Sequence, residues 1–376
     1  MQRRKVVPHA GPTGLASALP FSPGPTEAGV QAQRAGNRIE AGVGMVSAQA
    51  EGPEPSGERP GMPRLRNLGK LLDPEIRAKN LRALRFAVRG LYWDLVRSQT
   101  ADPVFVVGCS RSGTTVTYET IAMSPQLLSF GHEIPEFWDS LWGPHQNHWE
   151  SEAAGAAQAR PEHRDAAQRY FFQRLGLGRV LDKTCINVMR VPYLHSLFPS
   201  ARFVYIHRDG RDNVSSLMDG WLHEGHFALG KLLGPFPCAV NIDGGAFREW
   251  SFFLPPGWRD YNEAPLEQVC AFQWLTANRL ALDALQQIPS RQWIRLRYED
   301  IFDRPLQMFR EVFERLELPF DDAVASRCAA LDALPTSIVK GAPKKEKWKE
   351  RHAAKIERIL PRIRPLMLEL GYDPDR

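Results

Sequence analysis

Short runs of β-branched and aromatic residues alternate along this chain with longer segments of helical periodicity. The four runs are Pro103–Val107, Arg179–Asp182, Arg202–Ile206 and Trp293–Arg297. Apolar residues recur at every third or fourth position in segments around and between them, at 73–98, 264–287 and 305–316. Strands that alternate with helices form βαβ units, whose strands run parallel. The sequence therefore predicts an α/β fold of three layers, with a central parallel sheet flanked by helices.

The first 63 residues differ in composition from the rest of the chain. They contain ten Gly and nine Pro but a single aromatic residue, Phe21. Such a segment buries too little apolar surface to offset the entropy lost on ordering. We therefore expect a disordered segment over 1–65 and one α/β domain over 66–376.

The composition of the whole chain limits the classes of protein to which it can belong. Of 376 residues, 43% are hydrophobic and 24% are charged, as in ordinary globular proteins. The five cysteines form no CxxC pair and no Cys/His spacing of a zinc site, which predicts free thiols in a reducing compartment. No apolar stretch is long enough to span a membrane, and Pro8, Gly11 and Pro12 interrupt the apolar core that a signal peptide needs. We expect a cytoplasmic protein.

A glycine-rich turn follows the first predicted strand. Its residues, Gly108-Cys-Ser-Arg-Ser-Gly113-Thr-Thr115, precede a helical segment at 116–123. A turn of this kind points backbone N–H groups at one place and adds the partial positive charge of a helix N-terminus, so it binds phosphate or sulfate. The strand, loop and helix together predict a P-loop-type fold.

The two glycines of this turn have the spacing of a Walker A loop, but Thr114 occupies the lysine position. In kinases and nucleotide hydrolases that lysine contacts the β- and γ-phosphates. Here the cation of the loop is Arg111, inside the loop itself. The loop is therefore suited to an anion other than a triphosphate, and a P-loop kinase or nucleotide hydrolase is the alternative function.

A second basic motif begins where the strand at 202–206 ends. It reads His207-Arg208-Asp-Gly-Arg211-Asp-Asn-Val-Ser-Ser216. Arg208 leaves the carboxyl end of a parallel strand, where open α/β sheets bind ligands. Ser216 lies eight residues later, about two helical turns on, where it can meet the same anion.

Together, the motifs S-R-S-G-T-T and R-D-G-R-D-x-x-S-S resemble those of the sulfotransferase family, which uses 3′-phosphoadenosine-5′-phosphosulfate (PAPS). The resemblance runs from about 103 to 372 and includes Leu181–Thr184, Arg297–Asp300 and Lys340–Lys349. It implies a soluble, bacterial-type enzyme that transfers a sulfuryl group from PAPS to a hydroxyl or amine by in-line displacement. The 3′-phosphate would contact Arg208 and Ser216. The 5′-phosphosulfate would contact Ser110, Arg111, Ser112, Gly113, Thr114 and Thr115.

Three further positions take their expected roles from the same resemblance. Lys183, at a strand end, would stabilise the leaving phosphate oxygen together with Arg111. Tyr298 resembles the family's tyrosine beside the adenine, although its ring could instead pack a helix entry. Lys340 resembles the late loop over the 3′-phosphate, with Lys344 and Lys347 as alternatives.

The general base is expected from a different segment. The histidine-base cytosolic branch of the family has histidine two residues after the catalytic lysine, and here that position is Cys185. In the segment Phe130-Gly-His-Glu133, Glu133 lies 22 residues after Arg111. This arrangement resembles the glutamate-base protein-tyrosine and carbohydrate branch. We expect Glu133 to remove the proton of the acceptor, with His132 as the second candidate.

The remaining motifs bear on the acceptor and other partners. Aromatic residues gather at 137–149 and 221–258, where they form either an acceptor pocket or part of the core. They suit a small-molecule, lipid or glycan acceptor. Residues 340–364 hold ten Lys/Arg against three Asp/Glu, but a 3′-phosphate explains so short a run, and we expect neither a nucleic-acid partner nor a metal. A non-catalytic nucleotide-binding member of the fold is a further alternative, but it would not need Lys183 and Glu133.

Overall fold

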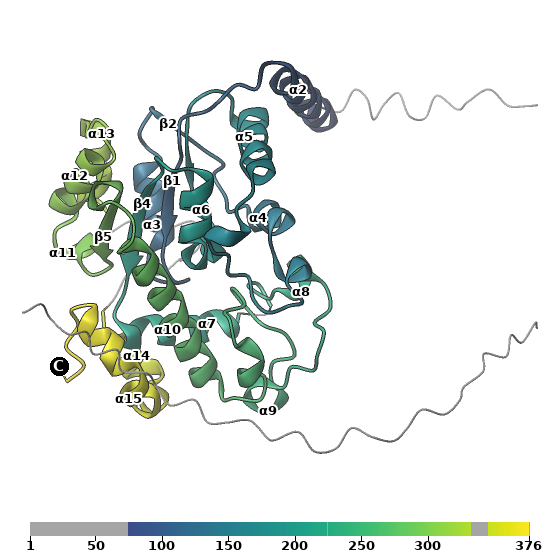
Figure 1. Cartoon of the computed structure of the whole chain (residues 1–376). Coiled ribbons are helices and arrows are strands. Elements are labelled where there is room, and N and C mark those ends of the chain that lie inside the picture. The colour runs from purple at the N-terminus through teal and green to yellow at the C-terminus, as the bar shows by residue number, and fades with distance from the viewer. Residues whose placement is uncertain (1–73, 224, 332–344, 376) are drawn as a thin grey trace, which may run out of the picture. The chain divides into compact units, whose positions relative to one another are not determined.

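The computed structural model describes residues 74–223, 225–331 and 345–375 (Figure 1). All of them belong to the second of the two units into which the chain divides, Leu65–Arg376. The segment expected to be disordered, 1–65, lies outside the described residues. Lys340 and Lys344 lie outside them as well.

Five parallel strands form the central sheet, in the order β2-β3-β1-β4-β5. They are β1 (Val104–Val107), β2 (Leu127–Ser129), β3 (Arg179–Asp182), β4 (Arg202–His207) and β5 (Trp293–Arg297). Four of them are the runs expected from the sequence. The short edge strand β2 is additional and pairs with β3. The parallel sheet and its flanking helices confirm the predicted fold class.

Helices connect successive strands and cover both faces of the sheet (Figure 1). The expected helix at 116–123 begins two residues earlier, at Thr114, because the chain turns into it directly at Gly113. The helices are α2 (Pro74–Val96), α3 (Thr114–Ile121), α4 (Pro135–Leu141), α5 (Pro161–Leu175), α6 (Val191–Leu197), α7 (Gly210–Trp221), α8 (Gly230–Leu233), α9 (Ile242–Gly245), α10 (Leu266–Leu285), α11 (Asp300–Asp303), α12 (Pro305–Arg315), α13 (Asp322–Ala329), α14 (Lys347–Arg351) and α15 (Ala353–Glu369).

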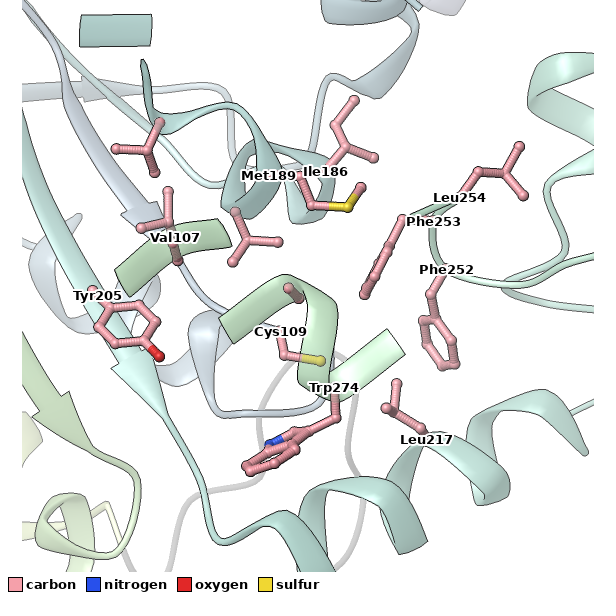
Figure 2. Packing of buried hydrophobic residues seen from close by; sticks show 14 of the residues in the cluster. Val107, Cys109, Ile186, Met189, Tyr205, Leu217, Phe252, Phe253, Leu254 and Trp274 are labelled. Atoms are coloured by element: carbon pink, nitrogen blue, oxygen red, sulfur yellow. The ribbon is translucent and has the colours of Figure 1, made fainter. Parts of the chain in front are cut away.

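Alternate residues of β1 point into two separate cores, because successive side chains of a strand face opposite sides of the sheet. Phe105 and Val107 join the larger core, with α5, α6, α7, α10 and α15. Val104 and Val106 join the smaller core, with α3, α11, α12 and α13. Figure 2 shows part of the larger core, in which Val107 and Cys109 lie among side chains from several elements. These two cores make the sheet the middle layer of three.

The parallel sheet brings the carboxyl ends of all five strands to one edge. The chain leaves this edge at Gly108, Phe130, Lys183, Arg208 and Tyr298. The chain passes from β1 to β2 on one side of the sheet, returns through β3, and then crosses β1 to β4 on the other side, so the direction of the crossovers reverses beside β1. Ligands of open α/β folds bind at such a switch point, outside the carboxyl ends of the strands.

Candidate functional site

The loop from Gly108 to Gly113 makes a tight turn between β1 and α3. Gly113 has φ 99°, a left-handed conformation that favours glycine. A Cβ at Gly113 would also lie 2.4 Å from a ring carbon of Tyr298, and one at Gly108 would lie 2.4 Å from the carbonyl oxygen of Ile206. Both glycines are therefore needed for the loop to approach β4 and Tyr298 so closely.

Two hydrogen bonds fix the loop against the neighbouring elements. Asn213 Nδ2, on α7, donates to the carbonyl of Ser110 at 2.8 Å. Ser112 Oγ donates to the carbonyl of Ile206 at 3.3 Å, so its hydroxyl faces β4. The first backbone N–H groups of α3 have no acceptor within the helix. They are available to an anion seated on the loop.

Arg111, Arg208 and Ser216 come together beside this loop, although Arg111 lies about a hundred residues before the other two in the sequence. Arg111 Nε donates to Ser216 Oγ at 3.3 Å, and Arg208 Nη1 donates to the carbonyl of Arg111 at 3.3 Å. Burial, and next the charge of Arg208, lower the pKa of Arg111. Two guanidinium groups held together and partly removed from water favour an anion beside them.

Carboxylates compensate the charge of Arg208 poorly. Asp212 Oδ2 lies 4.0 Å from its Nη2, and the Asp212 carboxylate accepts the backbone N–H groups of Glu346 at 2.8 Å and Trp348 at 3.4 Å. Arg208 is 7% exposed, and its Nε has no hydrogen-bond partner among the described residues. Burial and the charge of Arg208 also lower the pKa of Lys347. These cations make one region of positive potential.

Lys183 and Glu133 form an ion pair on the other side of the loop. Lys183 Nζ lies 2.5 Å from Glu133 Oε1 and 3.4 Å from Thr115 Oγ1. The second oxygen of Glu133 accepts the backbone N–H of Cys185 at 2.9 Å. The side chain of Lys183 is 6% exposed and that of Glu133 is 29% exposed. The carboxylate is thus the more accessible partner of the pair.

A buried carboxylate fixes the end of β3 below this ion pair. Asp182 accepts hydrogen bonds from Trp138 Nε1 at 2.8 Å, Thr184 Oγ1 at 2.9 Å and Asn187 Nδ2 at 2.9 Å. Thr184 Oγ1 in turn accepts the backbone N–H of Ile134 at 3.2 Å. This network links the segment that carries Glu133 to the segment that carries Lys183.

Two cysteines lie at the site with thiols that stay protonated. Burial raises the pKa of Cys109, and burial together with the charge of Glu133 raises the pKa of Cys185. A thiol becomes a nucleophile only as the thiolate. Both shifts disfavour the thiolate form of these cysteines.

Tyr298 closes the site from the end of β5. The guanidinium carbon of Arg208 lies 4.4 Å from the centre of its ring, and the ring touches the position of Gly113. Its edge also meets Phe302 of α11 at 5.0 Å. The ring therefore packs against the loop and against the following helix at once.

The structure thus brings the expected residues from all five strand ends to one edge of the sheet. His132 is exposed and packs edge-on against Phe130, so Glu133 and not His132 meets Lys183. Asp212 and Asn213 are site residues that were not expected from the sequence. Both lie in the motif that begins at His207, about one helical turn after Arg208. This position in the sequence could have identified them as site residues.

An open hollow of about 970 Å³ lies among residues 221–251. Its lining includes Trp221, Phe236 and Phe247, with Lys231 and Arg248 as cations. Most tryptophans of the two aromatic stretches belong to the core, including Trp221, which also borders the hollow. Their exposed fractions are 3% or less at Trp138, Trp221, Trp250 and Trp258.

Two stacked phenylalanines lie next in sequence to residues that line this hollow. Phe227 and Phe252 stack at 4.6 Å, and the residues beside them, Ala228 and Ser251, form a backbone bridge and line the hollow. The ring of Phe227 lies 5.7 Å from the guanidinium of Arg111. The Cys185 thiol donates to the carbonyl of Phe252 at 3.5 Å. Phe227 and Phe252 therefore contact the cationic site, and their sequence neighbours line the hollow.

Known proteins match the part of the chain that carries this site. A model of the sulfotransferase family matches residues 103–230. Protein-tyrosine sulfotransferase A of Caenorhabditis elegans is 22% identical over 301 residues, which cover 74% of this chain and 69% of that protein. Sulfotransferase STF9 of Mycobacterium avium has a TM-score of 0.50 at 13% identity, covering 82% of this chain and 87% of that one. Sulfotransferase STF1 of Mycobacterium tuberculosis has a TM-score of 0.41 at 16% identity, covering 72% and 82%.

Over residues 103–230 the chain matches the sulfotransferase family, and this match together with the Caenorhabditis elegans relative supports an enzyme that transfers sulfuryl groups. The matched segment contains Arg111, Glu133, Lys183 and Arg208. Within residues 74–223, 225–331 and 345–375, no helix has the length and apolar character to cross a membrane. In the same ranges, no three His, Cys, Asp or Glu side chains are grouped to hold a metal ion.

Proposed function

We propose that this sulfotransferase takes its sulfuryl group from PAPS, held at both ends by the cations of the site. The observation that carries the proposal is the convergence of Arg111, Arg208 and Ser216, with Arg208 buried and poorly neutralised. Such a pair of guanidinium groups suits a multiply charged donor. The 5′-phosphosulfate would lie on the loop and the α3 N-terminus, and the 3′-phosphate against Arg208 and Ser216.

The adenine would lie beside Tyr298, whose ring already packs against the loop. In the basic C-terminal segment, the charge of Arg208 contributes to the lowered pKa of Lys347. It is the residue that we place beside the 3′-phosphate. Its neighbours Glu346 and Trp348 are fixed to Asp212 through their backbones.

Lys183 and Glu133 would assist the transfer step itself, Lys183 by stabilising charge and Glu133 by accepting a proton. Lys183, with Arg111, would stabilise the negative charge that grows on the leaving phosphate oxygen. Glu133 would accept the proton of the acceptor hydroxyl as the oxygen attacks sulfur in line. Glu133 suits this role because one oxygen is fixed by the Cys185 backbone while the side chain stays 29% exposed. When Lys183 turns toward the donor, the other oxygen is released for the acceptor.

Adenosine 3′,5′-bisphosphate (PAP), the product that PAPS leaves behind, should stabilise the protein far more than ATP. At a hundredfold excess over its dissociation constant, a ligand specific for the folded state adds roughly 2.7 kcal/mol to the free energy of unfolding. Thermal unfolding with PAP, with ATP and magnesium, and without ligand measures this directly. Stabilisation by ATP with no effect of PAP would favour the kinase or nucleotide hydrolase alternative and contradict the proposal.

We place the acceptor in the hollow, with its hydroxyl reaching past Phe227 and Phe252 toward Glu133. A hollow of about 970 Å³ is large enough for a drug-sized ligand. Its aromatic lining suits a small-molecule, lipid or glycan acceptor, and the Caenorhabditis elegans relative adds a tyrosine side chain to this range. The cytoplasmic location and the disordered segment over 1–65 stay predictions.

Replacing Phe247 by Ala should raise the KM for the acceptor about tenfold and leave the KM for PAPS within about twofold. Phe247 is half-buried and meets Trp221 edge-on at 5.5 Å, so its removal takes apolar contact from the hollow. Phe320→Ala is the matched control, because Phe320 is equally half-buried and meets Phe313 edge-on at 5.5 Å in the other core. A panel of phenols, alcohols and tyrosine peptides supplies the acceptor. Equal changes in both variants would remove the hollow from acceptor binding.

A further inference from the structure

The carboxylate of Asp212 lies where a negative charge should weaken anion binding. Asp212 is 6% exposed, and its Oδ2 lies 4.0 Å from Nη2 of Arg208, the residue that we place on the 3′-phosphate. A carboxylate beside an anion site repels the anion, and the repulsion is strongest where water is excluded. Burial also raises the pKa of Asp212, because it disfavours the charged form. The position of Asp212 therefore calls for a role other than charge compensation.

The two oxygens of Asp212 fix the first turn of α14 from outside that helix. Glu346 precedes α14, and its own side chain does not cap the helix. Instead, Asp212 Oδ2 accepts the backbone N–H of Glu346 at 2.8 Å, and Oδ1 accepts that of Trp348 at 3.4 Å. The first N–H groups of a helix have no acceptor within it. A carboxylate of α7 thus provides the cap that usually comes from the residue just before a helix.

The backbone of Glu346 has a conformation that needs such support. Its φ is 58°, in the left-handed region that residues other than glycine rarely adopt. Conformations of this kind persist where surrounding contacts hold them. Lys347 is the next residue, and the two bonds to Asp212 lie on either side of it. They therefore fix the point from which the Lys347 side chain leaves the backbone.

A second aspartate of α7 holds the other end of α14. Asp219 lies seven residues after Asp212, on the same face of α7, with Ser216 between them. The Asp219 carboxylate lies 2.6 Å from Arg351 Nη1 and 3.0 Å from His352 Nε2. Helix α14 is therefore fixed at both ends along the face of α7 that carries Ser216.

We propose that Asp212 is a positioning residue for the donor, because it holds α14 so that Lys347 reaches the 3′-phosphate. The inference rests on the proposed function, since it takes Arg208 and Lys347 as partners of that phosphate. Loss of the carboxylate would remove a repulsion but would also release Lys347. The second effect is expected to dominate. The charge of Asp212 is already shared between two N–H groups and Arg208, whereas Lys347 contributes a whole cation.

Calorimetric titration of PAP and of adenosine 5′-monophosphate (AMP) into the full chain tests this proposal. Asp212→Ala removes both acceptors, so it should weaken PAP binding about tenfold and leave AMP binding within about twofold. Asp212→Asn keeps one oxygen for the Glu346 N–H, so its affinity for PAP should return to within about threefold of the unaltered protein. A role through charge alone predicts the opposite sign, because both variants would then bind PAP more tightly.

A double-mutant cycle identifies the residue through which Asp212 acts. Lys347→Gln should also weaken PAP binding about tenfold, and adding Asp212→Ala to it should cause little further loss. Asp219→Asn releases the other end of α14 from a side chain that is 33% exposed. It should weaken PAP binding more than AMP binding, and it keeps the test available if Asp212→Ala does not fold.

Asp321→Ala is the matched control, because Asp321 also caps a helix, accepting the Val324 N–H of α13 at 2.9 Å beside the smaller core. It should lower the melting temperature and leave the binding of both nucleotides unchanged. The proposal fails if Asp212→Ala binds PAP as tightly as the unaltered protein or more tightly. It also fails if PAP and AMP binding fall together, or if the losses from Asp212→Ala and Lys347→Gln add. If the unaltered protein does not bind PAP, the proposed function itself is contradicted.

Discussion

Glu133→Gln is expected to lower turnover about a hundredfold or more while the affinity for PAP stays within about threefold. The amide keeps the size of the side chain and can still accept the backbone N–H of Cys185, but it cannot take a proton. Steady-state rates with saturating PAPS, together with calorimetric titration of PAP, separate the two quantities. Glu136→Gln is the control, because Glu136 is an exposed glutamate three residues later, in the first turn of α4.

The choice of acceptor separates a general base from a residue that only holds Lys183. A nitrophenol that is already ionised at the assay pH has no proton to lose, so Glu133→Gln should lower its turnover only slightly. With an aliphatic alcohol or a tyrosine side chain as the acceptor, turnover should fall by the full hundredfold. If both kinds of acceptor slow equally, Glu133 acts through its 2.5 Å pair with Lys183 and not as the base. If neither slows, Glu133 has no part in the mechanism.

Arg208→Ala is expected to weaken PAP binding about a hundredfold while adenosine 5′-monophosphate binding changes less than about threefold. The two nucleotides differ only in the 3′-phosphate, which we place on the Arg208 guanidinium. A charge-assisted hydrogen bond contributes about 1.5–3 kcal/mol, which corresponds to this loss of affinity. Calorimetric titration of both nucleotides into both proteins measures the difference.

Arg310→Ala is the matched control for this substitution. Its guanidinium carbon lies 4.7 Å from the centre of the Phe320 ring, much as that of Arg208 lies 4.4 Å from Tyr298. Arg310 is on α12, over the other core. Equal loss of affinity for the two nucleotides would show that Arg208 supports the loop through its bond to Arg111 and does not recognise the 3′-phosphate. Arg208→Lys, which keeps the charge without the fork, should give an intermediate affinity.

The sequence was most informative where chemistry follows directly from chain order. The run at 103–107 and the glycine-rich turn after it predicted β1, its loop and α3, because a buried strand followed by Gly and hydroxyl residues has few other structures. Glu133 was expected in the site from the family resemblance, because it lies 22 residues after Arg111. Its pairing with Lys183 was outside the reach of that reasoning, because the two residues meet only through the order of β2 and β3 in the sheet.

Contacts between distant segments explain the rest of what the sequence left open. Asp182 was part of a quoted motif, yet its role depends on Trp138 and Asn187, which it meets only in the folded chain. The stacked pair of Phe227 and Phe252 is a similar case. The two residues lie in a stretch of the sequence that has no helical or strand periodicity, so their contact could not be predicted. Tyr298 had two competing interpretations, and its ring touches both the loop and α11.

The hydrogen-bond ladder between β1 and β4 also sets the spacing of the two arginines. Val107 pairs with Tyr205, and Arg111 and Arg208 follow these residues by four and three positions. Slippage of this ladder by one residue would move Arg208 by about 3.3 Å, farther than a hydrogen bond tolerates. It would also turn each apolar side chain of β4 to the wrong core. Donor recognition and folding therefore depend on the same strand alignment, and selection for either one preserves the other.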